Sequence, residues 1–445
     1  MKKKIIIIIC SLLSLCLAIV AAAVVFSRGD LRIYNVEGKQ MVCLDSATIS
    51  DPAAWPEESR AYIDIAVTEA ATILSQQKNC SIEQAKKQLA TGGYRLYTAY
   101  DPTVQQALMG AYGNYTELSL EMGAAVTDLQ GRLVAAFTSH PDKNFATAQT
   151  PPYSSFKPLS VYAPALAAGK INYATGILDA PVTELDGKPW PSNPTQGYEN
   201  APIPVSYAVQ KSLNTVAVRC MDLLGLDNSF AFLDNFQIDL TGEKNRAESL
   251  GAEEVRGNIA LGHLDYGVTP VQMAGFYQIF GNGGCYAAPK TVMSLKDAFA
   301  TVYAYSYNPQ QALSGENAAI MNRLLQNVVT PGGTAKAAFD PDMPTAGKTG
   351  TGELGNWFVG VTPGYSCAIW HGNQLENNTA PEIYAAARDA FPKSEETDFP
   401  TAQGLTEKVF CAQSGNLAAK NCPYTAVGIF SAGLELPLCD VHKEQ

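Results

Sequence analysis

The sequence is poor in charged residues, and most of those present are acidic. Only 16% of the 445 residues are charged, and the net charge at pH 7 is −11. Beyond the first four residues no lysine- or arginine-rich stretch occurs, although a nucleic-acid partner requires a basic face. Because 47% of the residues are hydrophobic, the chain can bury a sizeable core. These properties argue against both a disordered polymer and a nucleic-acid-binding protein.

Metal-binding side chains are scarce, and their spacing matches no zinc motif. There are four histidines and ten cysteines, of which Cys10 and Cys16 fall in an N-terminal apolar run. Three of the other eight (Cys411, Cys422 and Cys439) are near the C-terminus. We therefore expect no metal and no cofactor. The even number of cysteines beyond the apolar run permits disulfides in an oxidising compartment.

The apolar run predicts a membrane anchor. Residues 5–26 reach about 33 Å as a helix, enough to cross a bilayer. A cleaved signal peptide is the alternative, but its apolar region is usually only about 7–15 residues long. Lysines before the run and a single Arg28 after it place the N-terminus in the cytoplasm. We predict a single-pass protein of the cell membrane whose remaining residues are extracytoplasmic.

Composition and periodicity divide the chain into four segments. Residues 1–26 form a cytoplasmic stub and anchor, and 27–93 a juxtamembrane helical stalk. The stalk contains a helix at 61–78 and a second one that Ser81 opens with a capping-box partner at Gln84. Residues 94–395 form the main domain, and 396–445 a cysteine-containing tail.

The main domain has strand patterns at both ends and helices between. A hairpin is predicted at 123–137, a long helical stretch at 154–226, and further helices at 269–280 and 315–328. Short strands follow at 345–351, 357–362 and 365–371. Strands followed by helices and then strands indicate an α+β fold with an antiparallel sheet.

Three short motifs carry the chemistry, in a fixed order: Ser154-Ser-Phe-Lys157, Ser212-Leu-Asn214 and Lys348-Thr-Gly-Thr351. Each is weak alone, and a second S-x-x-K occurs at Ser75. Context favours Ser154, because Pro158 is tolerated only in the first turn of a helix. Lys157 then shares a helix face with Ser154.

This set of residue types is suited to acyl transfer. A serine needs a neighbouring base, and Lys157 can serve if burial, the helix terminus and a second cation lower its pKa. Ser212 is suited to relaying the proton, and Asn214 to binding a substrate amide. Lys348, Thr349 and Thr351 can hold a carboxylate, while Gly350 lets a peptide approach. Backbone N–H groups of Ser154 and Thr351 would form the oxyanion hole.

Other enzyme motifs fail on their context. Gly347-Lys-Thr349 ends like a P-loop, but the required earlier glycine is Asp342. Residues 350–355 fit G-x-G-x-x-G, yet a strand pattern follows where a dinucleotide site needs a helix. No G-x-S-x-G elbow is present for a Ser-His-Asp triad.

Together the motifs resemble the active-site set of penicillin-binding proteins and serine β-lactamases. Further similarities favour the transpeptidase domain of bifunctional penicillin-binding proteins; they are Tyr97 to Gln105, Gly123 to Ala136, Thr269 to Ala274, Phe280 to Gly284, Val329 to Thr334, Trp357 to Gly360 and the tail from Cys411 to His442. The resemblance covers about residues 94–445 and implies a β-lactamase/transpeptidase-like fold, an antiparallel sheet with flanking helices and a helical lobe.

The resemblance also implies a reaction. Ser154 would attack the D-Ala-D-Ala carbonyl of a peptidoglycan stem peptide and pass the acyl group to an amine, and β-lactams would trap the acyl-enzyme. Residues 27–93 are too few for a glycosyltransferase domain, so a separate glycosyltransferase is an expected partner. Tyr153 stands where the family usually has glycine, and Asn356 where aspartate is frequent. Tyr153 is therefore expected to narrow the site or slow acylation.

Three alternatives stay open. A D,D-carboxypeptidase would use water in place of the amine, and the sequence does not separate it from a transpeptidase. A non-catalytic β-lactam sensor or scaffold is disfavoured by the complete motifs and by the four residues before the anchor. A β-lactamase needs a deacylating base, for which the sequence offers no convincing candidate.

Overall fold

The computed structural model describes residues 29–195, 197–372 and 375–442, which form parts of two compact units. One unit comprises residues 1–105 and 290–307, and the other 106–289 and 308–445. The predicted anchor at 5–26 lies outside the described residues. Within the described ranges, no helix combines the length and the apolar character that a bilayer crossing requires.

The first unit is a mixed sheet with two helices. Its strand order is β12-β11-β3-β1-β2, with β1 parallel to β3 and the other neighbours antiparallel. The elements are β1 (Leu31–Tyr34), β2 (Gln40–Leu44), α2 (Arg60–Lys78), α3 (Ile82–Thr91), β3 (Arg95–Thr98), β11 (Val292–Lys296) and β12 (Thr301–Ala304), with short 3₁₀ turns at Pro52–Ala54 and Glu57–Ser59. The capping box of Ser81 and Gln84 is present as predicted.

This unit differs from the expected helical stalk at 27–93. Strands precede the two helices, and residues 290–307 return from far along the chain to complete the sheet. Glu69 on α2 holds the returning segment, because its carboxylate accepts hydrogen bonds from the Thr291 backbone N–H at 2.7 Å and from the Thr291 hydroxyl at 2.5 Å. Such long-range pairing leaves little trace in local sequence periodicity.

The second unit is built on an antiparallel sheet of order β14-β15-β16-β4-β5. The strands are β4 (Met122–Asp128), β5 (Leu133–Thr138), β14 (Ala346–Gly352), β15 (Gly355–Val361) and β16 (Tyr365–His371). All five fall where the sequence predicted them. Every residue of β4 and β15 is buried, which means that both faces of the sheet are covered.

Successive side chains of β15 point to opposite faces of the sheet, so their contacts show which elements cover each face. Phe358 packs edge-on against Tyr384 of α13 (Ala380–Arg388), with ring centroids 4.8 Å apart. Trp357 points to the opposite face, where its indole N–H donates to the Pro151 carbonyl at 3.0 Å. Lys348 of β14 pairs with Val359 and therefore lies on the same face as Trp357.

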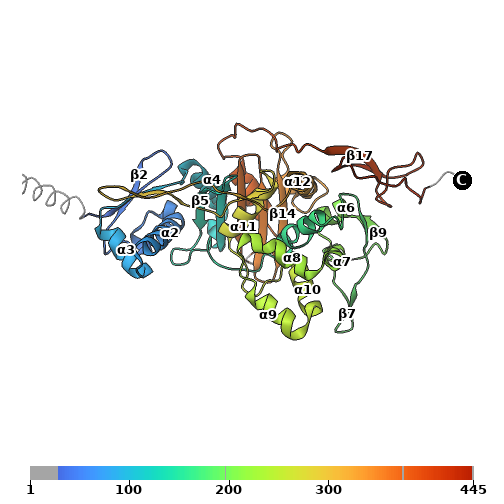
Figure 1. Cartoon of the computed structure of the whole chain (residues 1–445), viewed down its shortest axis with the longest axis horizontal. Helices are drawn as coiled ribbons and strands as arrows, with labels where there is room; N and C mark the ends of the chain where they lie inside the picture. Colours follow the sequence, from blue (N-terminus) through green and yellow to red (C-terminus); the bar gives the residue numbers. More distant parts are fainter. Residues whose placement is uncertain (1–28, 196, 373–374, 443–445) are drawn as a thin grey trace, which may run out of the picture. The chain divides into compact units, whose positions relative to one another are not determined.

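The remaining helices surround this sheet, and α7 to α10 form a lobe beside it (Figure 1). They are α4 (Pro102–Gly113), α5 (Ala163–Ala167), α6 (Val205–Lys211), α7 (Asn214–Leu224), α8 (Leu226–Leu233), α9 (Thr241–Leu250), α10 (Ala252–Leu261), α11 (Pro270–Tyr277) and α12 (Gly315–Val329). The short turns are Thr116–Leu118, η4 (Tyr153–Phe156), η5 (Pro158–Tyr162), Asp234–Phe236, Gln278–Phe280 and Lys336–Ala338.

The continuous helical stretch predicted at 154–226 is wrong. It is interrupted by two small antiparallel strand pairs, β6 (Gly176–Leu178) with β9 (Pro202–Pro204) and β7 (Thr183–Leu185) with β8 (Lys188–Trp190). The segment between α5 and α6 contains several prolines, which remove backbone donors and break helices. Two further strand pairs, β10 (Cys285–Tyr286) with β13 (Gln310–Gln311) and β17 (Leu405–Cys411) with β18 (Thr425–Ser431), complete the unit.

Candidate active site

The candidate nucleophile lies in a short turn at the start of a helical segment. Ser154 belongs to η4, and the Lys157 backbone N–H donates to the Ser154 carbonyl, which places the two residues one turn apart. Ser154 is partly exposed, whereas Lys157 is fully buried. The helix start that Pro158 predicted is therefore present, in the form of a 3₁₀ turn followed by a π turn.

The sheet and α11 fix this turn. The Trp357 indole on β15 donates to the Pro151 carbonyl at 3.0 Å, and the Tyr277 hydroxyl on α11 donates to the Ser155 carbonyl. Both hydrogen bonds involve residues close to Ser154 in sequence. The backbone of the turn is thus held from two elements of the core, as a preorganised nucleophile requires.

Strand β14 packs directly against the same turn. A Cβ atom at Gly350 would lie 2.3 Å from the Pro152 carbonyl oxygen, a distance that real side chains do not show. Only glycine at this position lets the strand approach so closely. Gly350 therefore brings the Lys348–Thr351 motif beside Ser154.

Lys157 is held by both ends of the second motif. Its Nζ donates to the Ser212 carbonyl at 2.9 Å and to Asn214 Oδ1 at 2.6 Å. Burial, and then the positive charge of Lys348, lower the pKa of Lys157 well below its ordinary value. A neutral amine has two N–H donors and one lone pair, so these two bonds leave the lone pair of Lys157 available to accept a proton.

Ser212 connects the second motif to the third. It caps α6 in the left-handed conformation, with φ of 59°, and its hydroxyl accepts a hydrogen bond from Lys348 Nζ at 2.8 Å. Lys348 is itself fully buried, and burial lowers its pKa to about 7. Lys157, Ser212 and Lys348 thus meet from three distant segments, and Ser154 lies one turn from Lys157.

Two residues that the sequence motifs do not include contact β14, and one of them, Asn378, also donates to the Trp357 carbonyl of β15. Thr334 shares a 2.8 Å hydrogen bond between hydroxyls with Thr349. Asn378 Nδ2 donates to the Gly350 carbonyl at 3.0 Å and to Thr351 Oγ1 at 3.2 Å. Asn378 follows no recognisable motif, but Thr334 lies in the Val329 to Thr334 stretch that resembles the family.

A buried network of hydrogen bonds fixes the backbone of Asn214. The Asn214 backbone N–H donates to Asn193 Oδ1 at 2.8 Å, and Asn193 Nδ2 donates to Asp179 Oδ1 at 2.7 Å. Asp179 also accepts from the Thr215 hydroxyl at 2.6 Å. Asp179 and Asn193 sit in the proline-rich segment that was predicted as helix, so sequence patterns gave no sign of them.

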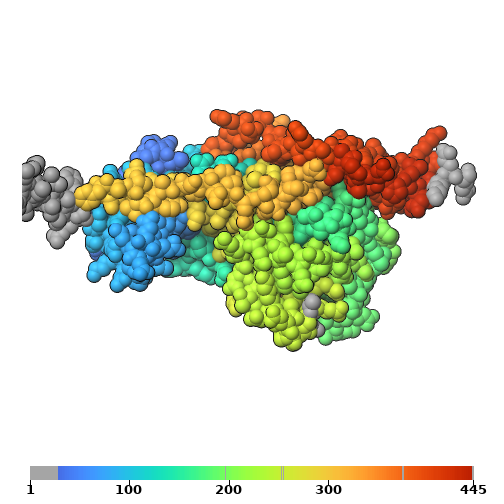
Figure 2. Space-filling view, in the orientation of Figure 1, coloured from blue at the N-terminus to red at the C-terminus, as the bar shows by residue number. Residues whose placement is uncertain are grey.

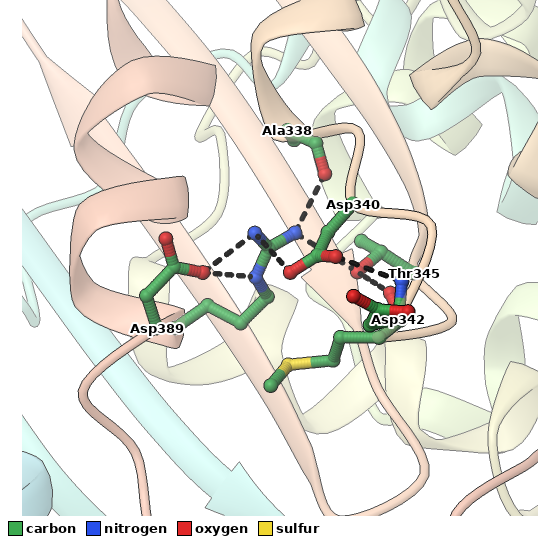
Figure 3. Close-up of polar contacts among 7 residues, drawn as sticks. Ala338, Asp340, Asp342, Thr345 and Asp389 are labelled. Carbon is green, nitrogen blue, oxygen red and sulfur yellow. Dashed lines mark hydrogen bonds and ion pairs between the residues drawn. The ribbon is translucent and has the colours of Figure 1, made fainter.

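A second polar network lies at the other end of β14. The Arg388 guanidinium on α13 is buried and donates to the Ala338 carbonyl at 2.6 Å and to Thr345 Oγ1 at 3.2 Å. It also forms ion pairs with Asp389 at 2.6 Å and Asp340 at 3.5 Å. Figure 3 shows these partners converging around the guanidinium. The network ties the loop that precedes β14 to α13.

The structure therefore brings together all eight residues that the sequence singled out: Ser154, Lys157, Ser212, Asn214, Lys348, Thr349, Gly350 and Thr351. The competing S-x-x-K is elsewhere. Ser75 lies in α2 of the first unit, where its hydroxyl donates to the Thr72 carbonyl one turn earlier at 3.0 Å. A serine within a helix commonly makes this bond, so Ser75 has the contact of an ordinary helix residue.

Comparison with known proteins places this site in a family. Residues 122–387 match the family described as penicillin binding protein transpeptidase domain. Penicillin-binding protein 1A of Clostridium acetobutylicum is 29% identical over 350 residues, which cover 70% of this chain and 42% of that protein. Penicillin-binding protein 1F of Bacillus subtilis is 29% identical over 369 residues, which cover 78% of this chain and 48% of that protein. The chain thus spans less than half the length of these relatives.

Solved structures show the same fold. Penicillin-binding protein 1A from Haemophilus influenzae superposes with a TM-score of 0.67 at 14% identity, covering 92% of this chain and 98% of that one. The PonA1 protein from Mycobacterium tuberculosis in complex with penicillin V gives 0.62 at 21% identity, covering 76% and 95%. The mixed α+β architecture expected from the sequence is confirmed. With the match at 122–387 spanning more than half of its residues, the chain belongs to the penicillin-binding protein transpeptidase family.

Proposed function

We propose that the chain is a serine D,D-transpeptidase that cross-links peptidoglycan stem peptides. Ser154 attacks the carbonyl between the two D-alanines, the terminal D-alanine leaves, and the acyl group passes from Ser154 to an amine of a second stem peptide. The observation that carries this proposal is the contact of two buried lysines with Ser212 beside Ser154. Burying two amines costs stability, and amines whose pKa values are lowered in this way are typical of catalytic sites.

The hydrogen bonds suggest how protons move. Lys157 accepts the Ser154 proton through its lone pair as the serine attacks. Ser212, whose hydroxyl is bonded to Lys348, relays this proton from Lys157 to the leaving amine, so that Lys157 becomes a neutral base again. The Oδ1 of Asn214 holds the amine of Lys157, so Asn214 acts on the base as well as on the substrate amide.

The edge of β14 provides the substrate site. This strand ends the sheet order, and its neighbour in the sheet is β15, so an extended peptide can add along the other side. Lys348, Thr349 and Thr351 supply donors for the terminal carboxylate of the peptide, and the backbone N–H groups of Ser154 and Thr351 supply the oxyanion hole. β-Lactams are proposed to acylate Ser154, as in the imipenem acyl-enzyme complex of penicillin-binding protein A from M. tuberculosis, which shares this fold at a TM-score of 0.61.

Fluorescent penicillin tests the site assignment. We expect the purified protein to be labelled covalently, and Ser154→Ala to abolish the labelling. Ser75→Ala is the matched control, because it removes the serine of the other S-x-x-K motif and should label like the wild type. Labelling that persists in Ser154→Ala would contradict the assignment, and rapid release of the label would indicate a β-lactamase.

The acceptor is tested with a stem peptide that ends in D-Ala-D-Ala. Mass spectrometry of the products, with and without an added amine, distinguishes the two reactions. A transpeptidase yields the amide with the added amine, whereas a D,D-carboxypeptidase yields the shortened peptide in both cases. The second result would keep Ser154 as the nucleophile but replace the proposed reaction.

Membrane attachment and orientation are part of the proposal. Residues 5–26 anchor the protein, and the two described units face the outside, where they act on glycan strands supplied by a separate glycosyltransferase. Cys43 is exposed and offers a probe of orientation. A membrane-impermeant maleimide applied to intact cells should label the wild type more than Cys43→Ser, and equal labelling would contradict the orientation.

A further inference from the structure

The C-terminal tail gathers four metal-binding side chains far from the candidate active-site residues in sequence. Cys411, Cys422, Cys439 and His442 each offer one ligand atom, and these four atoms lie within 4.8 Å of one another. Cys411 ends β17, Cys422 lies in the loop between β17 and β18, and the other two follow β18. The sequence predicted no metal, because linear spacing alone does not reveal that the hairpin brings these residues together from separate turns.

We propose that these four residues bind one Zn²⁺ in a closed structural site. Three thiolates and an imidazole form a typical ligand set for tetrahedral zinc. With metal–ligand distances of about 2.3 Å for sulfur and about 2.0 Å for nitrogen, a tetrahedral site places sulfur and nitrogen about 3.5 Å apart. His442 Nδ1 lies 3.5 Å from Cys411 Sγ and 3.4 Å from Cys439 Sγ. These two sulfur–nitrogen distances already match a tetrahedral zinc site, so the three side chains need to move little to bind the ion.

Backbone hydrogen bonds hold the ligand-bearing segments in register. Leu417 lies between them: its N–H donates to the Pro437 carbonyl at 2.9 Å, and its carbonyl accepts from the Cys439 N–H at 2.8 Å. The Cys411 N–H donates to the Asn416 carbonyl at 2.8 Å. The turn after Cys411 and the segment before Cys439 are thus fixed to each other without a metal, so the site is largely preorganised.

Hydrogen-bond donors also surround the sulfur atoms. The Ser414 hydroxyl donates to Cys439 Sγ at 3.3 Å, and the Ala419 N–H donates to Cys422 Sγ at 3.2 Å. Donors of this kind stabilise thiolates and orient metal ligands. They have no comparable purpose in a disulfide, which would also leave the third cysteine and His442 unused.

The tail needs such a cross-link because its own core is small. Within the paired strands β17 and β18, buried side chains are few, and Phe410 and Phe430 pack edge-on against Tyr173. A two-stranded hairpin is marginal by itself, and small segments of this kind are commonly stabilised by a metal. The tail also lies at the molecular surface (Figure 2). Zinc would cross-link the end of β17 and the loop after it to the segment that follows β18.

Metal content of the full-length protein tests the proposal. Protein purified under reducing conditions without chelators should contain about one zinc per chain by inductively coupled plasma mass spectrometry. Cys411→Ser/Cys439→Ser should contain almost none, whereas Cys285→Ser, which changes a partly buried cysteine outside the cluster, should keep the full amount. Ser414→Ala should retain all four ligands but bind zinc about 10-fold more weakly, because it removes only the hydrogen bond from the Ser414 hydroxyl to Cys439 Sγ.

The wild-type protein alone gives a further readout that does not depend on any variant folding. Replacing zinc with Co²⁺ should produce the intense visible bands of tetrahedral cobalt–thiolate coordination, and chelation should speed proteolytic cleavage in the tail. Absence of zinc together with absence of cobalt uptake would overturn the proposal, as would a native disulfide between any two of the three cysteines. Because the site lies outside the acylation residues, penicillin labelling of Ser154 should persist after chelation, so the two proposals can fail separately.

Discussion

Replacing Lys348 with methionine should make the protein more stable at neutral and acidic pH while abolishing its activity. Lys348 is fully buried, and burial lowers its pKa from 10.5 to about 7. A shift of that size corresponds to a penalty of roughly 5 kcal/mol for keeping the lysine at this position below pH 7. Methionine is similar in length and carries no charge, so Lys348→Met removes the penalty.

The variant also loses a favourable interaction. The hydrogen bond between Lys348 Nζ and the Ser212 hydroxyl disappears, and an unsatisfied buried hydroxyl costs about 1–3 kcal/mol. The expected net gain in the free energy of unfolding is therefore about 2–4 kcal/mol at pH 6. Such a gain would show that the site lowers the stability of the fold, as is common for catalytic residues.

The difference in free energy of unfolding between Lys348→Met and the wild type should depend on pH, and this dependence is a sharper test than the size of the difference at one pH. Between pH 7 and 10.5 the unfolded chain keeps the Lys348 proton and the folded protein does not, so rising pH favours the folded wild type. The advantage of the variant should therefore shrink by about 2–3 kcal/mol between pH 6 and pH 9. Below pH 6 it should stay constant, because both states of the wild type are then protonated.

Denaturant unfolding followed by tryptophan fluorescence measures this difference. Trp357 lies in the strand paired with β14 and reports on the unit that contains Lys348. Lys336→Met is the matched control, because this lysine is exposed in the same unit and should change stability little at any pH. A variant less stable than the wild type at pH 6, or a difference that does not change with pH, would refute the reasoning.

Three other substitutions test separate parts of the site. Lys157→Arg should slow acylation by fluorescent penicillin about 10²–10⁴-fold, because a guanidinium cannot give up its proton to become a base; near wild-type rates would exclude Lys157 as the base. Gly350→Ala should cost about 1–3 kcal/mol in denaturant unfolding and at least about 10²-fold in acylation, since its Cβ would push the turn carrying Ser154 out of place. Arg388→Met should lower the free energy of unfolding by about 2–3 kcal/mol, a figure reduced because the Asp340 side chain is partly exposed and that of Asp389 is exposed. An unchanged value would mean that the network in Figure 3 does not hold β14.

Local patterns were sufficient wherever a segment's own residues determine its structure. The capping box at Ser81, the hairpin of β4 and β5, and strands β14 to β16 all follow from short-range periodicity and turn residues. The three active-site motifs were also recognisable locally, because the residues of each are close together in the sequence. That the three motifs lie at one site was expected only from their order along the chain, which resembles that of a known family.

Pairings between distant segments could not be derived from such patterns. Strand β16 pairs with β4, which lies more than 200 residues earlier, and residues 290–307 complete a sheet begun by β1. Nothing within either segment specifies its partner, because strand pairing depends on packing against cross-strand and same-face neighbours that are distant in the sequence. The cluster of Cys411, Cys422, Cys439 and His442 was missed for the same reason, because a spacing rule describes residues of one turn and these four come from three separate segments.

Tyr153 shows how a departure from the family pattern becomes understandable once the backbone is known. The position before the nucleophile has a φ of +50°, a left-handed conformation that glycine adopts freely and that costs other residues about 1–2 kcal/mol. Here the tyrosine ring packs onto Gly352, where a Cβ would lie 2.1 Å from the ring, and its hydroxyl accepts a hydrogen bond from the Leu354 N–H at 3.0 Å. Burying an aromatic ring contributes at least as much as the conformation costs. Because only 5% of the residue is exposed and its ring packs on β14 and the turn after it, Tyr153 braces the strand that carries Lys348, and this packing compensates the strain of its own backbone.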